Sequence, residues 1–305
     1  MSDRLYVGVD GGGTRARAVV IDDAGRELAR TIGPSGLVDP RDPAGAAAVI
    51  ADLARSALEQ AGGGRAASLC CGLAGAGRPQ EREAVRVALA LEHVADEILV
   101  VGDAEAAMID AFPDGEGVLL VAGTGSIAWA RRRDGTSIRV GGWGMLLGDE
   151  GSGYDIGLQA MRAVARAHDG RSPATALTKP ICDAAGVRSP DDLIAWSAGA
   201  TKAQIGALAP IVLQHADADD AARTIRADAV DALLLLTVTA ARRADLREPA
   251  VALTGGLIAR GRGPLRPEVR AAIERDLPGA RILERDIDAA IGAARICLHG
   301  PGTSV

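Results

Sequence analysis

The sequence predicts an α/β protein built from two related halves, and three observations lead to that prediction. Strand-like and helix-like segments alternate along most of the 305 residues. A pattern of apolar strand, Gly/Thr turn and second strand occupies residues 6–21 and returns at 118–135. Hydrophobic residues make up 48% of the chain, which is ample for a core. We therefore expect two medium-sized domains that share one plan.

The first hairpin, YVGVDGGGTRARAVVI, carries three consecutive glycines between its strands. Because they lack a Cβ atom, Gly11, Gly12 and Gly13 leave backbone N–H groups free to approach a phosphate. The turn is not a Walker A loop, which needs a lysine after its last glycine, and it does not open a helix as a dinucleotide fingerprint does. Taken alone, it could equally be a tight hairpin without a ligand.

The second hairpin, VLLVAGTGSIAWARRRDG, repeats the plan around the turn 123–126. This recurrence favours a phosphate-binding role for both turns. Asp10 stands beside the first turn, where the second hairpin has Ala122. Mg²⁺ prefers one or two carboxylates together with phosphate oxygens, so we favour Asp10 as a magnesium ligand over a purely turn-forming aspartate.

The rest of the first half alternates strands and helices. The pattern predicts strands at 26–32, 68–73 and 97–101 and helices at 44–61, 79–91 and from 104 onward. Ligands of such a mixed, partly parallel sheet gather at the carboxyl ends of its strands. Asp103 follows one of these ends. Its carboxylate could act as a general base, cap the following helix, or do both.

The second half adds a Gly-rich acidic segment and a run of helices. Strands are expected at 137–141, 250–253 and 281–283, and helices from Ser152 or Gly153 to about 167 and at about 173–185, 191–196, 202–216, 219–244, 267–276 and 288–298. We expect a first domain over 1–115, with the closing helix at about 288–300 packed back on it. The second domain covers 116–287 and has a helical insertion at about 152–245.

Composition narrows the choice of partners. A formal charge of −6 and an aromatic content of 2% argue against a nucleic-acid partner. The arginines at 131–133 are interpreted as part of a solvated edge strand. The longest uncharged runs, 117–130 and 203–216, are 14 residues long, too short for a membrane helix. No export signal opens the sequence, and the four cysteines lack metal-binding spacing, so we expect a cytoplasmic protein with reduced thiols.

Six motifs occur in an order that resembles the N-acetylglucosamine kinases of the BadF/BadG/BcrA/BcrD ATPase family. They are VDGGGT (9–14), GLAG (72–75), GDAEAA (102–107), AGTGS (122–126), GGWG with GDEGSG (141–153) and TGG (254–256). The resemblance covers about residues 5–300. It implies two duplicated actin-like, ribonuclease H-like domains with a nucleotide cleft between them, and ATP and Mg²⁺ as cofactors.

The same resemblance implies roles for individual residues. Asp103 is the expected catalytic base and a substrate contact. The sugar would be bound by Ser126, Gly142, Trp143, Gly144 and Asp149, although Trp143 could instead be a packed core indole. The phosphates and adenosine of ATP would be bound by Gly11, Gly12, Gly13, Thr14, Gly123, Thr124, Gly125, Gly255 and Gly256.

The expected activity is phosphorylation of the 6-hydroxyl of N-acetylglucosamine, with glucosamine as the alternative acceptor. Gly36 and Ile127 stand where many relatives place polar sugar-binding side chains, which leaves the acceptor open. The partners would be ATP and an amino sugar, with no nucleic acid and no membrane. The oligomeric state is left open, a homodimer included.

Two less favoured alternatives are an activator ATPase of 2-hydroxyacyl-CoA dehydratases and a sugar-sensing transcription regulator. The activator would need cysteines that bind an iron–sulfur cluster, and the adjacent Cys70 and Cys71 suit that poorly. The regulator would need a DNA-binding module before the first hairpin, where about four residues stand.

Overall fold

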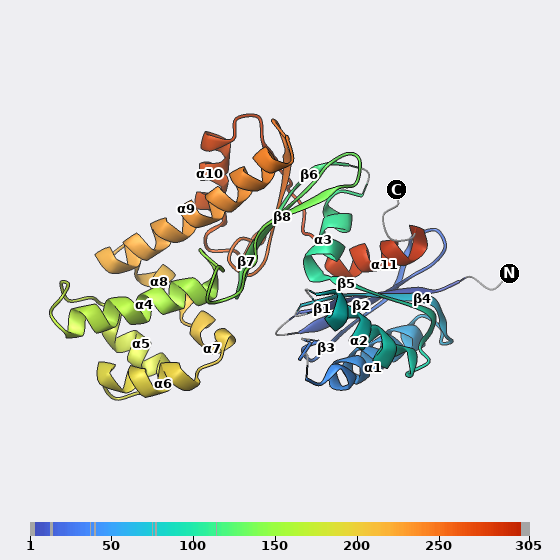
Figure 1. Cartoon of the computed structure of the whole chain (residues 1–305), viewed down its shortest axis with the longest axis horizontal. Helices are drawn as coiled ribbons and strands as arrows, with labels where there is room; N and C mark the ends of the chain where they lie inside the picture. The colour runs from blue at the N-terminus through green and yellow to red at the C-terminus, as the bar shows by residue number, and fades with distance from the viewer. Residues whose placement is uncertain are drawn as a thin grey trace. The chain divides into compact units, whose positions relative to one another are not determined.

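The structure, a computed structural model, describes residues 4–12, 15–36, 38–39, 41–74, 76, 78–113 and 115–299. The chain divides into two compact units, one formed by Met1–Gly115 with Ile287–Val305 and the other by Glu116–Asp286. Each unit contains one five-stranded sheet with helices packed against it (Figure 1).

The sheet of the first unit has the strand order β3-β2-β1-β4-β5. β1 is antiparallel to β2, and β2 to β3, whereas β1, β4 and β5 run parallel. The parallel strands are covered on both faces, which explains why β1 and β4 are apolar along most of their length. The strands are β1 (Tyr6–Gly11), β2 (Ala16–Ile21), β3 (Glu27–Gly33), β4 (Ala66–Leu73) and β5 (Ala95–Gly102).

Helices cover both faces of this sheet. Val20 of β2 belongs to the core under α1 and α2, and its neighbour Val19 belongs to a cluster with α11, because successive strand residues point to opposite faces. A Cβ on Gly8 of β1 or on Gly292 of α11 would collide with backbone across the contact, so these two glycines allow α11 to lie close to β1 and α3. The helices are α1 (Pro43–Gln60), α2 (Pro79–Ala90), α3 (Asp103–Ala111) and α11 (Ala289–His299).

The sheet of the second unit has the order β10-β9-β6-β7-β8. β6, β7 and β8 are antiparallel neighbours, and β6, β9 and β10 run parallel, so the topology of the first sheet is repeated. This repeat confirms the two-copy interpretation of the hairpin pattern. The strands are β6 (Gly117–Ala122), β7 (Ser126–Arg131), β8 (Ser137–Gly141), β9 (Ala250–Thr254) and β10 (Arg281–Ile282).

The edge-strand interpretation of residues 131–133 is wrong. β7 lies inside the sheet, between β6 and β8, and Arg131 at its end is buried. β8 pairs with β7 from residue 127 to residue 131, so β7 has a hydrogen-bonded neighbour on each side. The positive charges of Arg132 and Arg133 belong to the β7–β8 turn and not to an exposed strand edge.

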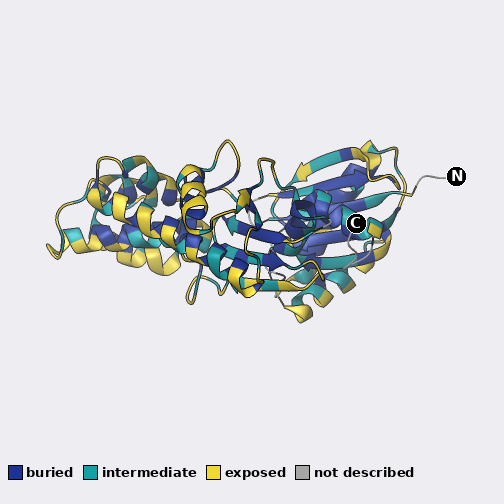
Figure 2. Cartoon of the chain, turned by 90° about the horizontal axis from the view of Figure 1, so that it is seen from above, coloured by how far each residue is buried: buried dark blue, intermediate teal, exposed yellow. Residues whose placement is uncertain are grey.

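A helical segment between β8 and β9 contributes most of the buried apolar residues in the core of this unit. Buried residues are dark blue in Figure 2. The helix expected at 202–216 is two helices, because Pro210 lacks an N–H and its ring would clash with the carbonyl of Gly206, where α7 ends. The helices are α4 (Gly153–His168), α5 (Thr178–Ala185), η1 (Pro190–Asp192), α6 (Leu193–Gly199), α7 (Lys202–Gly206), α8 (Ala209–His215), α9 (Asp220–Arg243) and, after β9, α10 (Arg266–Asp276).

Asp219 determines where two helices of this segment begin. α5 begins later than the expected residue 173, because the Ala176 N–H and the Thr175 hydroxyl donate to Asp219 and hold residues 175–176 outside the helix. The carboxylate of Asp219 also caps α9.

Among the described residues, no helix combines the length and the apolar character that crossing a membrane would require.

Candidate active site

Asp10 and Asp103 lie at the same edge of the first unit's sheet. Asp10 is in register with Gly72 of β4, and Asp103 begins α3 directly after β5. Because β1, β4 and β5 are parallel, their carboxyl ends meet at this edge, where ligands of such sheets bind. The strand order therefore brings together the two carboxylates that the sequence analysis selected.

Asp10 has an electrostatic environment that favours a cation. Burial raises the pKa of Asp10 to about 6; Arg17, its register partner on β2, acts in the opposite direction, and the charges of Asp103 and Asp288 raise the pKa further. Among the described residues, no three His, Cys, Asp or Glu side chains form a metal cage. The residues thus fit Mg²⁺, which keeps water and phosphate oxygens and needs only one or two carboxylates.

Asp103 presents its carboxylate at the surface of the first unit. Its Oδ1 accepts a hydrogen bond from the Ala104 N–H at 2.8 Å. Enough protein surrounds the carboxylate that partial desolvation raises the pKa of Asp103, against the opposing effects of the Ala104 N–H and of Arg82. The helix cap is Gly102, so Asp103 is the first residue of α3 and not its N-cap. Its second oxygen remains able to accept a proton from a hydroxyl.

The segment that contains Ser35 and Gly36 packs closely against the turn after β1. A Cβ on Gly11 would lie 3.1 Å from the Gly36 carbonyl oxygen, and a Cβ on Gly36 would lie 3.0 Å from Gly11 Cα. The hydroxyl of Ser35 donates to the Gly12 carbonyl at 3.2 Å. Gly36, one of the two departures from the family pattern, is thus a backbone support of the turn, and a side chain there would require the turn to shift. Gly13 and Thr14, both expected to bind ATP, lie outside the described residues.

The turn after β6 has its carbonyl groups occupied and two of its N–H groups available. The first N–H groups of α4, from Gly153 and Tyr154, donate to the carbonyls of Gly123 (2.8 Å) and Thr124 (3.2 Å). The Gly123 N–H donates to the Gly125 carbonyl at 2.9 Å. Within the described part of the chain, the N–H groups of Thr124 and Gly125 have no acceptor. Adjacent free N–H groups of this kind form a natural site for a phosphate.

The third glycine turn lies beside this one. Gly255 has φ +99°, and a Cβ there would collide with Ala122 at the end of β6. The Leu257 N–H donates to the Ala122 carbonyl at 3.0 Å. A Cβ on Gly256 would have no atom within 4 Å, whereas one on Gly123 would lie 3.8 Å from the Gly256 nitrogen. The structure therefore brings two of the expected ATP-binding turns together and leaves open space above Gly256.

The loop after β8 contains the expected sugar-binding residues. Gly142 (φ +67°) and Gly144 (φ +84°) adopt left-handed conformations, which give the loop its tight course. The side chain of Ile127 fills the space beneath Gly142. Trp143 is 64% exposed, with the guanidinium of Arg139 5.2 Å from the centre of its ring. The interpretation of Trp143 as a packed core indole is therefore wrong, and its ring is available to a ligand.

Asp149 is a buried carboxylate in a left-handed conformation (φ +62°), which is uncommon outside glycine. Its Oδ1 accepts from the Ser126 N–H at 3.1 Å, and its Oδ2 lies 2.6 Å from Lys202 Nζ. The Ser126 hydroxyl donates to the Glu150 carbonyl at 2.7 Å, so Ser126 ties the β6–β7 turn to the loop that carries Asp149. The sequence analysis did not select Lys202.

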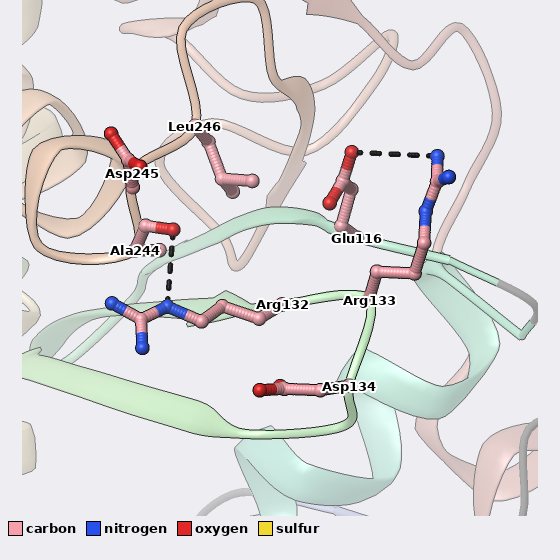
Figure 3. Close-up of a pocket in the computed structure, with 7 residues that line it drawn as sticks. All are labelled: Glu116, Arg132, Arg133, Asp134, Ala244, Asp245 and Leu246. Atoms are coloured by element: carbon pink, nitrogen blue, oxygen red, sulfur yellow. Dashed lines mark hydrogen bonds and ion pairs between the residues drawn. The ribbon is translucent and has the colours of Figure 1, made fainter.

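A separate hollow at the opposite end of β6 and β7 is not part of this site. Figure 3 shows Arg132 and Arg133 at its rim. Arg132 donates to the carbonyls of Ala244 (3.2 Å) and Arg243 (2.9 Å), and Arg133 pairs with Glu116 at 3.8 Å. Arg132 is thus held against the end of α9, while the side chain of Arg133 is 86% exposed.

Comparisons with known proteins show which proteins the chain resembles. The chain matches the BadF/BadG/BcrA/BcrD ATPase family over residues 7–297. It is 30% identical to an N-acetylmuramic acid/N-acetylglucosamine kinase of Clostridium acetobutylicum, over 96% of this chain and 98% of the relative, and 31% identical to the glucosamine kinase of Vibrio cholerae, over 70% and 72%. A solved structure from Chromobacterium violaceum, of a protein proposed to be an N-acetylglucosamine kinase, has a TM-score of 0.78 at 27% identity and covers 97% of this chain and 99% of its own.

Proposed function

Because this chain belongs to the BadF/BadG/BcrA/BcrD ATPase family, we propose that it is an ATP-dependent amino-sugar kinase that phosphorylates the 6-hydroxyl of N-acetylglucosamine. The observation that carries the proposal is the turn after β6, where the N–H groups of Thr124 and Gly125 have no acceptor among the described residues and Asp149 is held beside them. A phosphate site adjacent to a fixed carboxylate is what a sugar kinase needs.

The chemical step follows from the roles of the residues. The carboxylate of Asp103 accepts the proton of the sugar hydroxyl, while the oxygen of that hydroxyl bonds to the terminal phosphorus of ATP. The bond from that phosphorus to the bridging oxygen breaks, and ADP leaves with the electron pair. Catalysis of phosphoryl transfer is mostly positioning and neutralisation of charge, so the N–H groups of Thr124 and Gly125 contribute by holding the phosphates.

Asp10 is the residue that would hold Mg²⁺. When bound, the ion would supply positive charge to the phosphate oxygens of ATP. The raised pKa of Asp10 supports this role, since a partly buried carboxylate near Asp103 and Asp288 gains from a neighbouring cation.

The acceptor sugar is inferred from the loop after β8. An acetamide requires an apolar wall for its methyl group, and the exposed ring of Trp143 can supply one. Free glucosamine would bring an ammonium group, and the carboxylate of Asp149 is already paired with the ammonium of Lys202. Both observations favour the acetylated sugar. The similarity to the Vibrio cholerae glucosamine kinase keeps glucosamine as the second candidate. Leu37, another expected apolar contact, lies outside the described residues.

The test is a comparison of kcat/KM for N-acetylglucosamine, glucosamine, N-acetylmuramic acid and glucose under saturating MgATP, with NMR identification of the phosphorylated oxygen. We expect N-acetylglucosamine to give the highest value and its 6-phosphate as the product. A tenfold higher value for glucosamine would overturn the choice of acceptor, and a phosphate on another oxygen would overturn the 6-hydroxyl assignment.

A further inference from the structure

Lysine is almost absent from this protein. Lys and Arg together number 34, yet only two of them, Lys179 and Lys202, are lysines. Lys179 lies on an exposed face of α5 and pairs with Asp183 one helical turn away, at 2.6 Å. Lys202 instead comes from the short α7 and reaches the loop that joins β6 and β7. Their different surroundings point to different uses of the same side chain.

The ammonium of Lys202 lies directly over the β6–β7 turn. A Cβ on Gly125 would stand 2.8 Å from Lys202 Nζ and 2.6 Å from Asp149 Oδ1. The absence of a side chain at Gly125 is therefore what lets both charged groups approach the turn. The ion pair itself, 2.6 Å from Nζ to Oδ2, fixes where the ammonium sits.

Only part of the hydrogen-bonding capacity of Lys202 is used by Asp149. An ammonium has three N–H donors, and the side chain remains 36% exposed. Beside it are the N–H groups of Thr124 and Gly125, which have no acceptor in the part of the chain that the structure describes. A compact ammonium fits this narrow space above a glycine, whereas the larger planar guanidinium of arginine would need more room. Positive charge and unpaired donors thus converge at one point of the second unit.

We propose that Lys202 binds a phosphate oxygen of ATP at the turn 123–126 and supplies a cation that this turn does not carry in its own sequence. This inference rests on the proposed kinase function. Asp149 keeps the ammonium over the turn, and Lys202 in return compensates the buried charge of Asp149. The ion pair therefore joins a phosphate-binding group to a residue proposed to contact the sugar.

The alternative is that Lys202 only neutralises Asp149, because a buried carboxylate without a partner is destabilising. The two roles differ in how they depend on the phosphates of the nucleotide. A phosphate contact affects the affinity for ATP and not that for adenosine. A purely structural role affects both equally, through distortion of the turn.

The first experiment measures the affinities for ATP and adenosine, without sugar, in the wild type and in Lys202→Met, Lys202→Arg and Lys179→Met. We expect Lys202→Met to weaken ATP binding about 10- to 100-fold, with adenosine binding unchanged, since hydrogen bonds between charged partners are the strong ones. Lys202→Arg should recover part of the loss, and Lys179→Met should match the wild type. Equal losses for ATP and adenosine, or no loss for ATP, would overturn the proposal.

The second experiment uses the wild-type protein and does not depend on a variant that folds. An amine-reactive reagent modifies Lys179 and Lys202, and mass spectrometry follows each rate. MgATP should slow modification of Lys202 at least about tenfold and leave Lys179 unchanged, and N-acetylglucosamine alone should protect neither. Absence of protection by MgATP would refute the contact. Since neither experiment requires phosphorylation of a sugar, a wrong acceptor assignment would leave these results unaffected.

Discussion

Asp10 is a residue at which the stability of the fold and the proposed function oppose each other. Its folded-state pKa of about 6 lies above the ordinary value of 3.8, so the folded protein binds this proton more tightly than the unfolded chain. The resulting cost to stability is absent below about pH 3.8, grows as the pH rises and is complete above about pH 6. An ionised carboxylate that lowers the stability of the folded protein in this way is typical of functional sites.

Replacing Asp10 with asparagine should therefore stabilise the protein near neutral pH. We expect Asp10→Asn to raise the free energy of unfolding by about 1–3 kcal/mol at pH 7.5, because each pKa unit corresponds to about 1.4 kcal/mol. The gain should shrink towards pH 4, where the wild-type carboxyl is largely protonated. Denaturant unfolding at the two pH values measures the difference. A gain that does not change with pH would show that the charge of Asp10 is not its cause.

The same pKa predicts a competition between protons and magnesium. The kcat/KM for MgATP should fall as the pH drops below about 6, because protonated Asp10 cannot serve as a metal ligand. Raising free Mg²⁺ about tenfold should move this decline to lower pH. Recovery of full activity on return to pH 7.5 is the control for unfolding. A decline that stays at the same pH at every Mg²⁺ concentration would remove Asp10 from the metal site.

Sequence reasoning found the carboxylates but not their partners. Asp10, Asp103 and Asp149 stand next to glycine turns or strand ends, which are visible as local patterns. Lys202 could not be found in this way, because it comes from the helical segment, far along the chain from Asp149. The one available signal was its rarity as one of two lysines.

At the scale of elements, the turn after β9 separates a structural glycine from a functional one. Gly255→Ala should destabilise the protein by about 1 kcal/mol or more, because its φ is +99° and a Cβ would collide with Ala122. Gly256→Ala should leave the melting temperature unchanged, because a Cβ there meets no atom within 4 Å. If adenosine lies against this turn, Gly256→Ala should raise the KM for ATP several-fold. An unchanged KM would place the adenosine elsewhere.

Most strands and helices could be predicted because periodicity and glycine or proline punctuation mark them locally. The exceptions depend on contacts between distant residues. α5 begins late because Asp219 binds residues 175–176, and β7 is internal because β8 pairs with it. The break between α7 and α8 was the exception that a local signal, Pro210, could have revealed.

At the scale of the whole molecule, α11 completes the first unit from the other end of the chain. It buries Ala290, Ala293, Ala294 and Ile296 against that unit, so the N-terminal segment alone lacks part of its core. The second unit is continuous from Glu116 to Asp286 and has its own core. The two units should therefore respond differently to truncation after Asp286.

Hydrogen exchange measured by mass spectrometry tests this difference. In a chain that ends at Asp286, protection should be lost in β1 and β2 and retained in β6 and β9. The isolated segment 116–286 should unfold cooperatively by itself. Retained protection in β1 and β2 of the truncated chain would mean that α11 is dispensable for the first unit.

In the proposed reaction, Asp103 removes the proton from a sugar hydroxyl during transfer of phosphate from ATP. The most direct measurement compares kcat and the dissociation constant of ATP between the wild type and Asp103→Asn, with the exposed turn variant Asp134→Asn as control. We predict that Asp103→Asn lowers kcat at least about 10²-fold while ATP binding stays within about threefold, because an amide fills the same space but cannot accept the proton. An Asp103→Asn enzyme with the kcat of the wild type would contradict the account.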